Sequence, residues 1–273
     1  MKNFDHNSGE YLWTEDADIY YEVTGEEGNP ALLVLHGGFG TLEDFNSVIS
    51  ELEKEFRVIG IDSRGHGKST LGKQTLSYGQ LQKDVQRVLE HLNVDKLSII
   101  GFSDGGIVAY RLASLTSLII EKLVTIGSRW HLKNTEPTRE LFLKITGESW
   151  RNKFPATYDA YQKLNPDLDF DFLAESLVKM WLDENTSGYP NEAVKNISCS
   201  TLIVRGDDDH LISKATVFEL SEIVSGSRLL NIPFAGHAAF EDQKEIFMIS
   251  LNEFFTGTPK TDAKRFNVES RIS

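Results

Sequence analysis

The chain has 273 residues, of which 40% are hydrophobic and 25% charged, and its formal net charge is −13. This composition is that of an ordinary globular protein, and the length suits one large core with an insertion. The acidic balance argues against nucleic acid or an anionic membrane as partner, because phosphate groups bind clustered cations. It leaves the oligomeric state open.

The first residues and the single cysteine bear on the compartment. No run approaches the roughly 18 consecutive apolar residues of a membrane helix. The start is polar and acidic where a signal peptide would carry an apolar core, so we expect a cytoplasmic protein. Because Cys199 is the one cysteine in the sequence, an internal disulfide is excluded. Cys199 also lacks the further ligands that a metal site needs, so we expect it to be a small packing residue.

Strand and helix patterns alternate along most of the chain. Glu10–Trp13 and Asp18–Val23 are rich in β-branched and aromatic residues and predict an antiparallel hairpin. Six continuous apolar runs predict parallel strands covered on both faces: Ala31–Leu35, Arg57–Ile61, Leu97–Ile100, Lys122–Ile126, Thr201–Val204 and Arg228–Ile232. The clearest helix between them is Gln80–Asn93. The alternation predicts an α/β fold with a mostly parallel eight-stranded sheet and helices on both faces.

The alternation breaks at residues 129–196, where aromatic and amphipathic pieces such as Ser149–Phe154 and Phe170–Trp181 replace strands. We predict a core at residues 1–128 and 197–255, with 129–196 inserted as a helical lid. Residues 256–273 are polar without apolar periodicity and are expected to form a loosely attached C-terminal extension.

The segment Gly101–Gly105 fits the pattern G-x-S-x-G. It follows the predicted strand Leu97–Ile100 and opens the apolar helical segment Gly106–Leu115, the strand–turn–helix setting of a nucleophilic serine. Glycines flank Ser103 because so sharp a turn leaves no room for side chains beside it. The alternative, a glycine-rich turn with an incidental serine, is disfavoured by this context. We predict that Ser103 is a nucleophile.

A serine hydroxyl needs a base to take its proton and an acid to fix the histidine tautomer. His237 follows the last predicted strand, and Asp207, Asp208 and Asp209 follow the strand Thr201–Val204. The carboxyl ends of parallel strands meet at one edge of the sheet, where sites of this kind lie. A lone loop histidine is usually solvated, but the serine and the upstream acids make His237 the predicted base. Spacing alone does not choose among the three aspartates.

Five segments together resemble the α/β-hydrolase fold family over roughly residues 10–255: His36–Gly38, Asp62–Ser69, Gly101–Gly105, Gly206–Ile212 and Gly236–His237. The resemblance implies the fold of that family, with a lid over the site. In the family's pattern G-D-x-D-x-x-V/I the second aspartate is catalytic, which implies Asp209 as the acid that orients the histidine. Asp207 is the alternative.

The resemblance also implies an oxyanion hole for the tetrahedral intermediate. Its donors would be the backbone N–H groups of Gly38 and Asp104. Phe39 replaces Gly38 if the glycine turn is shifted by one.

The segment Gly67-Lys68-Ser69 has a faint likeness to a phosphate-binding loop, but Asp62 stands where that motif needs its first glycine. Nucleotide binding is therefore rejected. The resemblance implies structural, loop-bracing roles for four residues: Asp62, Arg64, His36 and His66. Three further histidines are expected at the surface or in the lid: His6, His91 and His131.

These residues predict a serine hydrolase that cleaves a small-molecule carboxylic ester through an acyl-enzyme, without metal or organic cofactor. Related dehalogenases and epoxide hydrolases carry aspartate in place of Ser103, which argues against their chemistries. Lactone, thioester or C–C bond hydrolysis and ester perhydrolysis on the same residues stay open. So does a non-catalytic receptor for a small ligand.

Substrate selection is expected in the lid. Its aromatic residues are candidates for a pocket, although aromatic residues at helical spacing more often pack in a core: Trp130, Phe142, Trp150, Phe154, Tyr158, Tyr161, Phe172 and Trp181. The segment Gly101–Gly106 is similar to that of valacyclovir-hydrolase-like enzymes, in which the aspartate after the nucleophile recognises an α-amino group. This likeness implies that Asp104 selects amino-acid esters.

Overall fold

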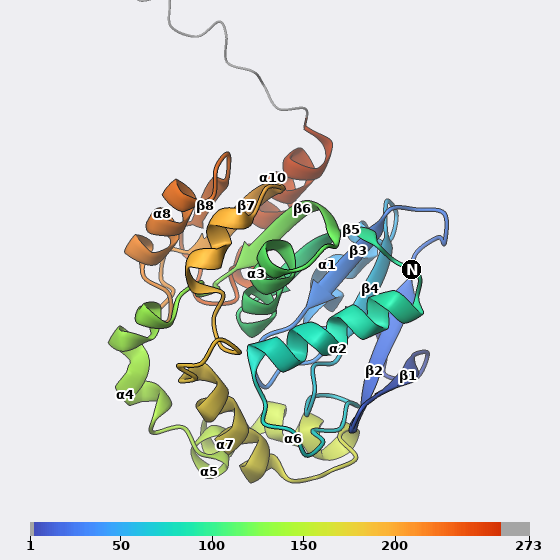
Figure 1. The fold of residues 1–273 in the computed structure, drawn as a ribbon, viewed down its shortest axis with the longest axis vertical. Helices are drawn as coiled ribbons and strands as arrows, with labels where there is room; N and C mark the ends of the chain where they lie inside the picture. Colours follow the sequence, from blue (N-terminus) through green and yellow to red (C-terminus); the bar gives the residue numbers. More distant parts are fainter. Residues whose placement is uncertain (1–2, 258–273) are drawn as a thin grey trace, which may run out of the picture.

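The computed structural model describes residues 3–257, so the predicted extension 256–273 lies almost wholly outside the described residues. An eight-stranded sheet of order β1-β2-β4-β3-β5-β6-β7-β8 forms the centre (Figure 1). Its strands are β1 Glu10–Thr14, β2 Ala17–Thr24, β3 Ala31–Leu35, β4 Arg57–Ile61, β5 Lys96–Phe102, β6 Ile119–Ile126, β7 Ser200–Gly206 and β8 Arg228–Ile232. The pairs β1–β2 and β2–β4 are antiparallel, and all other neighbours are parallel. The predicted hairpin and mostly parallel sheet are confirmed.

Helices cover both faces of this sheet (Figure 1). One face carries α2 Tyr78–His91, α3 Asp104–Leu115 and α8 Lys214–Ile223, and the other carries α1 Asn46–Leu52, α9 Ala239–Asp242 and α10 Lys244–Thr256. The helix α2 begins two residues before its predicted start, because the Ser77 side chain accepts a hydrogen bond from the N–H of Gln80 and caps it. Within residues 3–257, no helix combines the length and apolar character needed to cross a membrane.

Strand β3 shows why the central strands have continuous apolar sequences. Successive side chains of a strand point to opposite faces. Leu33 and Leu35 pack on the side of α2 and α3, whereas Leu32 and Val34 pack on the side of α1 and α10. All four are at most 1% exposed. Because both faces are covered, no position of the strand has to be polar.

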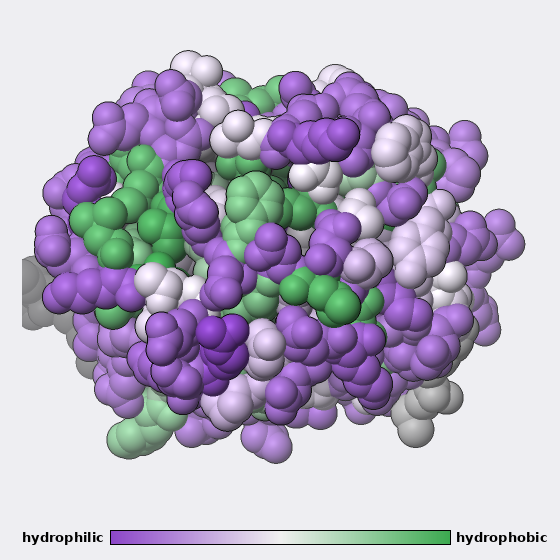
Figure 2. Space-filling model, turned by 90° about the horizontal axis from the view of Figure 1, so that it is seen from below, coloured by the Kyte–Doolittle hydropathy of each residue, from purple (hydrophilic) through white to green (hydrophobic). Residues whose placement is uncertain are grey.

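Four α-helices lie between β6 and β7 in the chain: α4 Arg139–Phe142, α5 Gly147–Lys153, α6 Pro155–Leu164 and α7 Phe170–Trp181. They lie below the sheet in Figure 1. Seen from their side, the surface is mostly hydrophilic, with hydrophobic residues gathered in separate areas (Figure 2). Exposed large hydrophobic side chains on or beside these helices are Leu141, Leu143, Phe154, Leu168 and Phe172. The 3₁₀ helix η3 Asn191–Asn196, which ends this segment, packs against the core helix α3.

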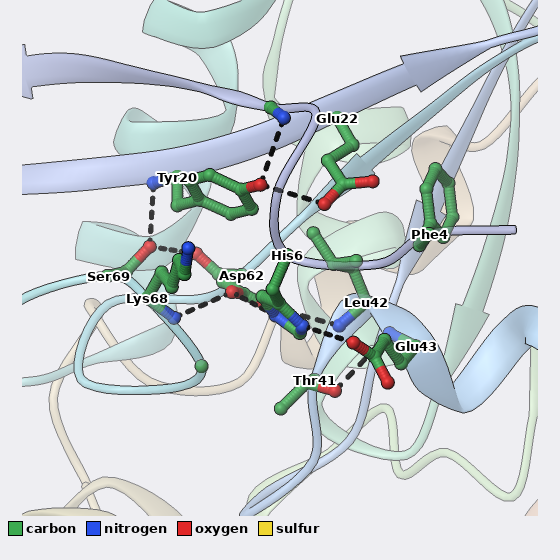
Figure 3. A network of polar contacts seen from close by, with 12 residues as sticks. Phe4, His6, Tyr20, Glu22, Thr41, Leu42, Glu43, Asp62, Lys68 and Ser69 are labelled. Carbon is green, nitrogen blue, oxygen red and sulfur yellow. Dashed lines mark hydrogen bonds and ion pairs between the residues drawn. The ribbon is translucent and has the colours of Figure 1, made fainter. Parts of the chain in front are cut away.

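The N-terminal segment before β1 packs against the loops that follow β3 and β4 (Figure 3). His6 is only 1% exposed, so its predicted surface position is wrong. Its Nε2 lies 2.8 Å from Asp62 Oδ2, and its Nδ1 lies 2.6 Å from Glu43 Oε1. These partners are 56 and 37 positions away in the chain, where local sequence patterns do not reveal them.

Asp62 joins three segments of chain. Besides His6, it accepts hydrogen bonds from the N–H of Leu42 at 2.9 Å and of Lys68 at 2.8 Å. Burial opposes a charge on His6, but the hydrogen bonds and charges of Asp62 and Glu43 outweigh it and raise the pKa of His6 to about 9. The imidazole is therefore protonated at neutral pH and ties the N-terminal segment to the loop after β3.

Candidate active site

Ser103 lies in a strained turn between β5 and α3. Its backbone has φ 51° and ψ −116°, outside the usual regions for a residue with a side chain. Glycine is required on both sides: a Cβ at Gly101 would lie 2.5 Å from Gly105 O, and one at Gly105 would lie 2.1 Å from Leu35 O. The turn holds the serine at the carboxyl edge of the sheet, as a nucleophile elbow does.

Ser103, His237 and Asp209 form a hydrogen-bonded series. With its proton on Nδ1, His237 donates to Asp209 Oδ2 at 2.9 Å, and its Nε2 accepts from the Ser103 hydroxyl at 3.0 Å. The other oxygen of Asp209 accepts from the N–H groups of Leu211 and Ile212 at 2.8 and 3.1 Å. Burial opposes ionisation of Asp209. The hydrogen bond from His237, the charge that His237 carries when it is protonated, and these two amides outweigh burial and lower the pKa of Asp209. The structure thus brings together three residues from the ends of β5, β7 and β8.

The neighbouring aspartates face elsewhere. Asp207 accepts a hydrogen bond from Asn231 at 3.0 Å and pairs with Lys214 at 2.5 Å. Asp208 is exposed. Of the three aspartates that spacing left open, Asp209 is the one that contacts the imidazole.

Two backbone N–H groups near Ser103 are candidates for an oxyanion hole. The N–H of Asp104 begins α3 and so has no acceptor within the helix. Gly38 lies beside the side chain of Asp104, because a Cβ at Gly38 would come within 2.6 Å of Asp104 Oδ2, and both residues line the same cavity as Ser103. The competing donor, the N–H of Phe39, is already used: it donates to His66 Nε2 at 3.0 Å. This arrangement favours Gly38.

The buried histidines His36 and His66 connect the glycine turn to the loop after β4. His36 Nε2 accepts a hydrogen bond from the N–H of Ser63 at 2.9 Å. His66 Nε2 likewise accepts one from the N–H of Phe39 at 3.0 Å. Burial lowers the pKa of His36 to about 4, so this ring is neutral and can act as an acceptor. In the same loop, Arg64 pairs with Asp84 at 2.8 Å.

The side chain of Asp104 points away from solvent and is already hydrogen-bonded. Its Oδ1 accepts from the Tyr78 hydroxyl at 2.7 Å, and its Oδ2 accepts from Trp181 Nε1 at 2.8 Å. Burial raises the pKa of Asp104 above the ordinary value. The bond to Trp181 connects helix α7 to the turn that carries Ser103.

A cavity of about 480 Å³ opens at Ser103 and is walled by the strand ends and by α4, α5 and α7. Its apolar lining consists of Phe102, Leu141, Phe142, Ile145, Trp150, Phe154, Trp181 and Leu211. Four of the eight predicted lid aromatics therefore line it, and four do not: Trp130, Tyr158, Tyr161 and Phe172. Trp130 is buried and donates to Thr216 O instead. A wider polar groove of about 790 Å³ between α2 and α7 contains none of these candidate catalytic residues.

Sequence reasoning missed several lining residues, such as Phe102, Arg129, His210 and Leu211. Each stands within three positions of a motif or of a strand end. That closeness is the signal by which they could have been found. Within residues 3–257, no group of three or more His, Cys, Asp or Glu side chains could hold a metal ion.

Comparison with known proteins agrees with this architecture. The human protein Serine hydrolase BPHL is 28% identical over 232 residues, which cover 80% of this chain and 76% of that protein. Bifunctional esterase/perhydrolase DCH of Acinetobacter calcoaceticus is 26% identical over 260 residues, covering 83% of this chain and 92% of that protein. The crystal structure of a hydrolase from Pseudomonas aeruginosa PA01 has the same fold, with a TM-score of 0.76 at 21% identity over 92% of this chain and 100% of that one.

The family model described as alpha/beta hydrolase fold matches residues 30–244. This range is most of the chain and contains Ser103, Asp209 and His237. The chain belongs to the α/β-hydrolase fold family.

Proposed function

We propose that this protein is a serine hydrolase that cleaves small-molecule carboxylic esters through an acyl-enzyme on Ser103. The observation that carries the proposal is the unbroken hydrogen-bonded series from Ser103 through His237 to Asp209, at the mouth of a largely apolar cavity. The similarity to a serine hydrolase and to an esterase supports the same class of chemistry.

In the first half-reaction, Ser103 Oγ attacks the ester carbonyl while His237 Nε2 takes the hydroxyl proton. Asp209 keeps the other imidazole proton on Nδ1 and stabilises the imidazolium. The N–H groups of Gly38 and Asp104 bind the negative oxygen of the tetrahedral intermediate. His237 then protonates the leaving oxygen, the C–O bond breaks, and the acyl group stays on Ser103.

In the second half-reaction, water attacks the acyl-enzyme and His237 takes a proton from it. The new intermediate collapses, Ser103 Oγ leaves with that proton, and the carboxylic acid is released. Hydrogen peroxide in place of water would give a peracid, and a cyclic ester would give a hydroxy acid, on the same residues.

The cavity limits the size of the substrate. About 480 Å³ lies within the range of roughly 300–1,000 Å³ typical of small-molecule sites, and the lining favours an apolar acyl or alcohol part. Selection of amino-acid esters by Asp104 stays a prediction. Asp104 lines the cavity, but both of its oxygens already accept hydrogen bonds from protein donors.

Ester hydrolysis by wild type and by Ser103→Ala tests this proposal. The substrates are 4-nitrophenyl esters from acetate to decanoate, with an alanine ester and its propionate match, at pH values from 5 to 9. We expect wild type to turn over at least one ester of this series. Ser103→Ala removes the nucleophile and should abolish this turnover. At most, a residual rate about 10³-fold above that of the uncatalysed reaction in water should remain.

Two results would overturn the proposal. Equal activity of wild type and Ser103→Ala would place the nucleophile elsewhere. Tight binding of a small ligand without turnover of any ester would favour a receptor. Equal rates on the alanine and propionate esters would contradict only the selection of amino-acid esters by Asp104.

A further inference from the structure

Arg129 is a buried cation in the wall of the cavity. It follows β6, the neighbour of the strand that carries Ser103, and is 7% exposed. All its hydrogen bonds go to neutral acceptors. Nε donates to Asn134 O at 3.2 Å, and Nη2 donates to Thr138 Oγ1 at 2.7 Å and Leu211 O at 2.8 Å. The guanidinium also lies over the Phe142 ring, 4.8 Å from its centroid.

No carboxylate of residues 3–257 lies within 4.0 Å of Arg129, and its Nη1 makes no hydrogen bond to them. Buried charges are normally paired, because an unpaired charge loses its hydration without compensation. Arg64 follows that rule with Asp16 and Asp84. Arg111 is also buried and has no ion pair with any residue in the described range, but it does not line the cavity. What sets Arg129 apart is its place at the candidate active site.

Two lysines line the same cavity: Lys144, between α4 and α5, and Lys153, the last residue of α5. Neither has an ion pair with any residue that the structure describes. Asp104 is the one acidic residue in the lining, and its oxygens are bound by neutral donors. The cavity lining therefore has three basic residues and one acidic residue. In the whole chain acidic residues are in excess, with 41 acidic and 28 basic residues.

We propose that the cavity takes esters that carry a carboxylate, and that Arg129, with Lys144 and Lys153, binds this carboxylate. The inference rests on the proposed function, since it names the substrate class of the same site. A carboxylate at Nη1 would give the guanidinium a hydrogen-bonded anionic partner, which no residue of 3–257 provides; Asp104 interacts with Arg129 only at longer range. The bonds to Thr138 and Leu211 hold the guanidinium in place, so that little side-chain freedom is lost on binding.

The test compares each anionic ester with the neutral ester in which carboxamide replaces the terminal carboxylate. One pair places the group on the acyl side, as mono-4-nitrophenyl adipate and its carboxamide. The other places it on the alcohol side, as 4-carboxyphenyl acetate and its carboxamide. We expect wild type to favour the anionic member of one pair by about tenfold to a hundredfold in kcat/KM, the range for hydrogen bonds to charged groups.

Variants separate recognition from structural support. Arg129→Met should remove the preference and change kcat/KM for the neutral ester by a much smaller factor, whereas Arg129→Lys should retain part of the preference. The double variant Lys144→Gln, Lys153→Gln should reduce the preference even if the arginine variants fold poorly. Lys54→Gln removes an exposed charge that does not line the cavity and serves as the matched control.

Binding to Ser103→Ala decides the inference without turnover. Titration with adipamic acid, which is anionic, and with neutral adipamide should give a lower Kd for the acid, and added salt should raise that Kd. If wild type hydrolyses both members of both pairs equally well, the inference is wrong and the proposed function stands. If Arg129→Met slows both members equally, the residue is only a brace. If no ester is hydrolysed, the proposed function fails, and equal Kd values would then overturn the inference as well.

Discussion

At the scale of single residues, the three adjacent aspartates after β7 differ in what they contact. Asp209 is buried. One of its oxygens accepts a hydrogen bond from His237, and the other accepts hydrogen bonds from two backbone amides. Asp207 is partly exposed and contacts Lys214 and Asn231. The same type of side chain therefore contacts the imidazole at one position and lies near the surface two positions earlier.

We expect Asp209→Asn to lower kcat by about 10³- to 10⁴-fold with little loss of fold. The asparagine oxygen can still accept from the amides of Leu211 and Ile212, so the loop is kept. Its NH₂ group then faces His237 Nδ1 and favours the tautomer with the proton on Nε2, which cannot accept from Ser103. Steady-state kinetics on a 4-nitrophenyl ester measure the effect.

Asp207→Asn is the matched control. It removes the charge that faces Lys214 but leaves the imidazole untouched, and kcat should stay close to the wild-type value. A loss of kcat in Asp207→Asn as large as in Asp209→Asn would contradict the assignment of the acid.

At the scale of elements, the strands and their order along the chain were predictable because burial on both faces leaves an apolar run. The exact first and last residues of the strands were harder to predict. Strand β6 begins at Ile119 and not at the predicted Lys122. Its first four residues, Ile119–Lys122, are exposed or half-buried, and two of them are charged, so they give no continuous apolar run. The N-terminal segment gave no signal at all, since the partners of His6 come from the loops after β3 and β4.

The charge on His6 makes the attachment of this segment depend on pH. The folded-state pKa, about 9, lies above the unfolded value of about 6.5, so the protonated form is favoured by folding. Its contribution is fully present below pH 6.5 and is lost as pH rises through 9. We expect the free energy of unfolding to fall by about 1–3 kcal/mol over this range.

Urea unfolding of wild type and His6→Gln at several pH values from 6 to 10 measures this contribution. The difference between the two proteins cancels every group that titrates alike in both. It should be largest near pH 6 and shrink toward pH 10. A difference that is constant across the range would mean that the charge of His6 plays no part.

At the scale of the whole molecule, the cavity exists because helices α4, α5 and α7 pack over the carboxyl edge of the sheet. The elbow, His237 and the three candidate acids could be found from local sequence, since each follows a strand. Which residues of the predicted lid line the cavity could not be found, because helical spacing does not say whether an aromatic ring such as Trp130 faces the core or the cavity. The same holds for the contact between α7 and the elbow.

That contact, from Trp181 Nε1 to Asp104 Oδ2, connects the helical layer to the turn that carries Ser103. Trp181→Phe should destabilise the fold by about 1–3 kcal/mol more than Trp150→Phe does, because it leaves a buried carboxyl oxygen without its donor. Trp150 is a suitable control: it lines the same cavity, and its buried Nε1 has no hydrogen-bond partner among residues 3–257. Both changes replace an indole by a phenyl ring, so the difference in urea unfolding free energy reports the donor that Asp104 loses together with the unpaired N–H that Trp150→Phe removes. Equal losses in the two variants would mean that apolar packing alone holds α7 to the core.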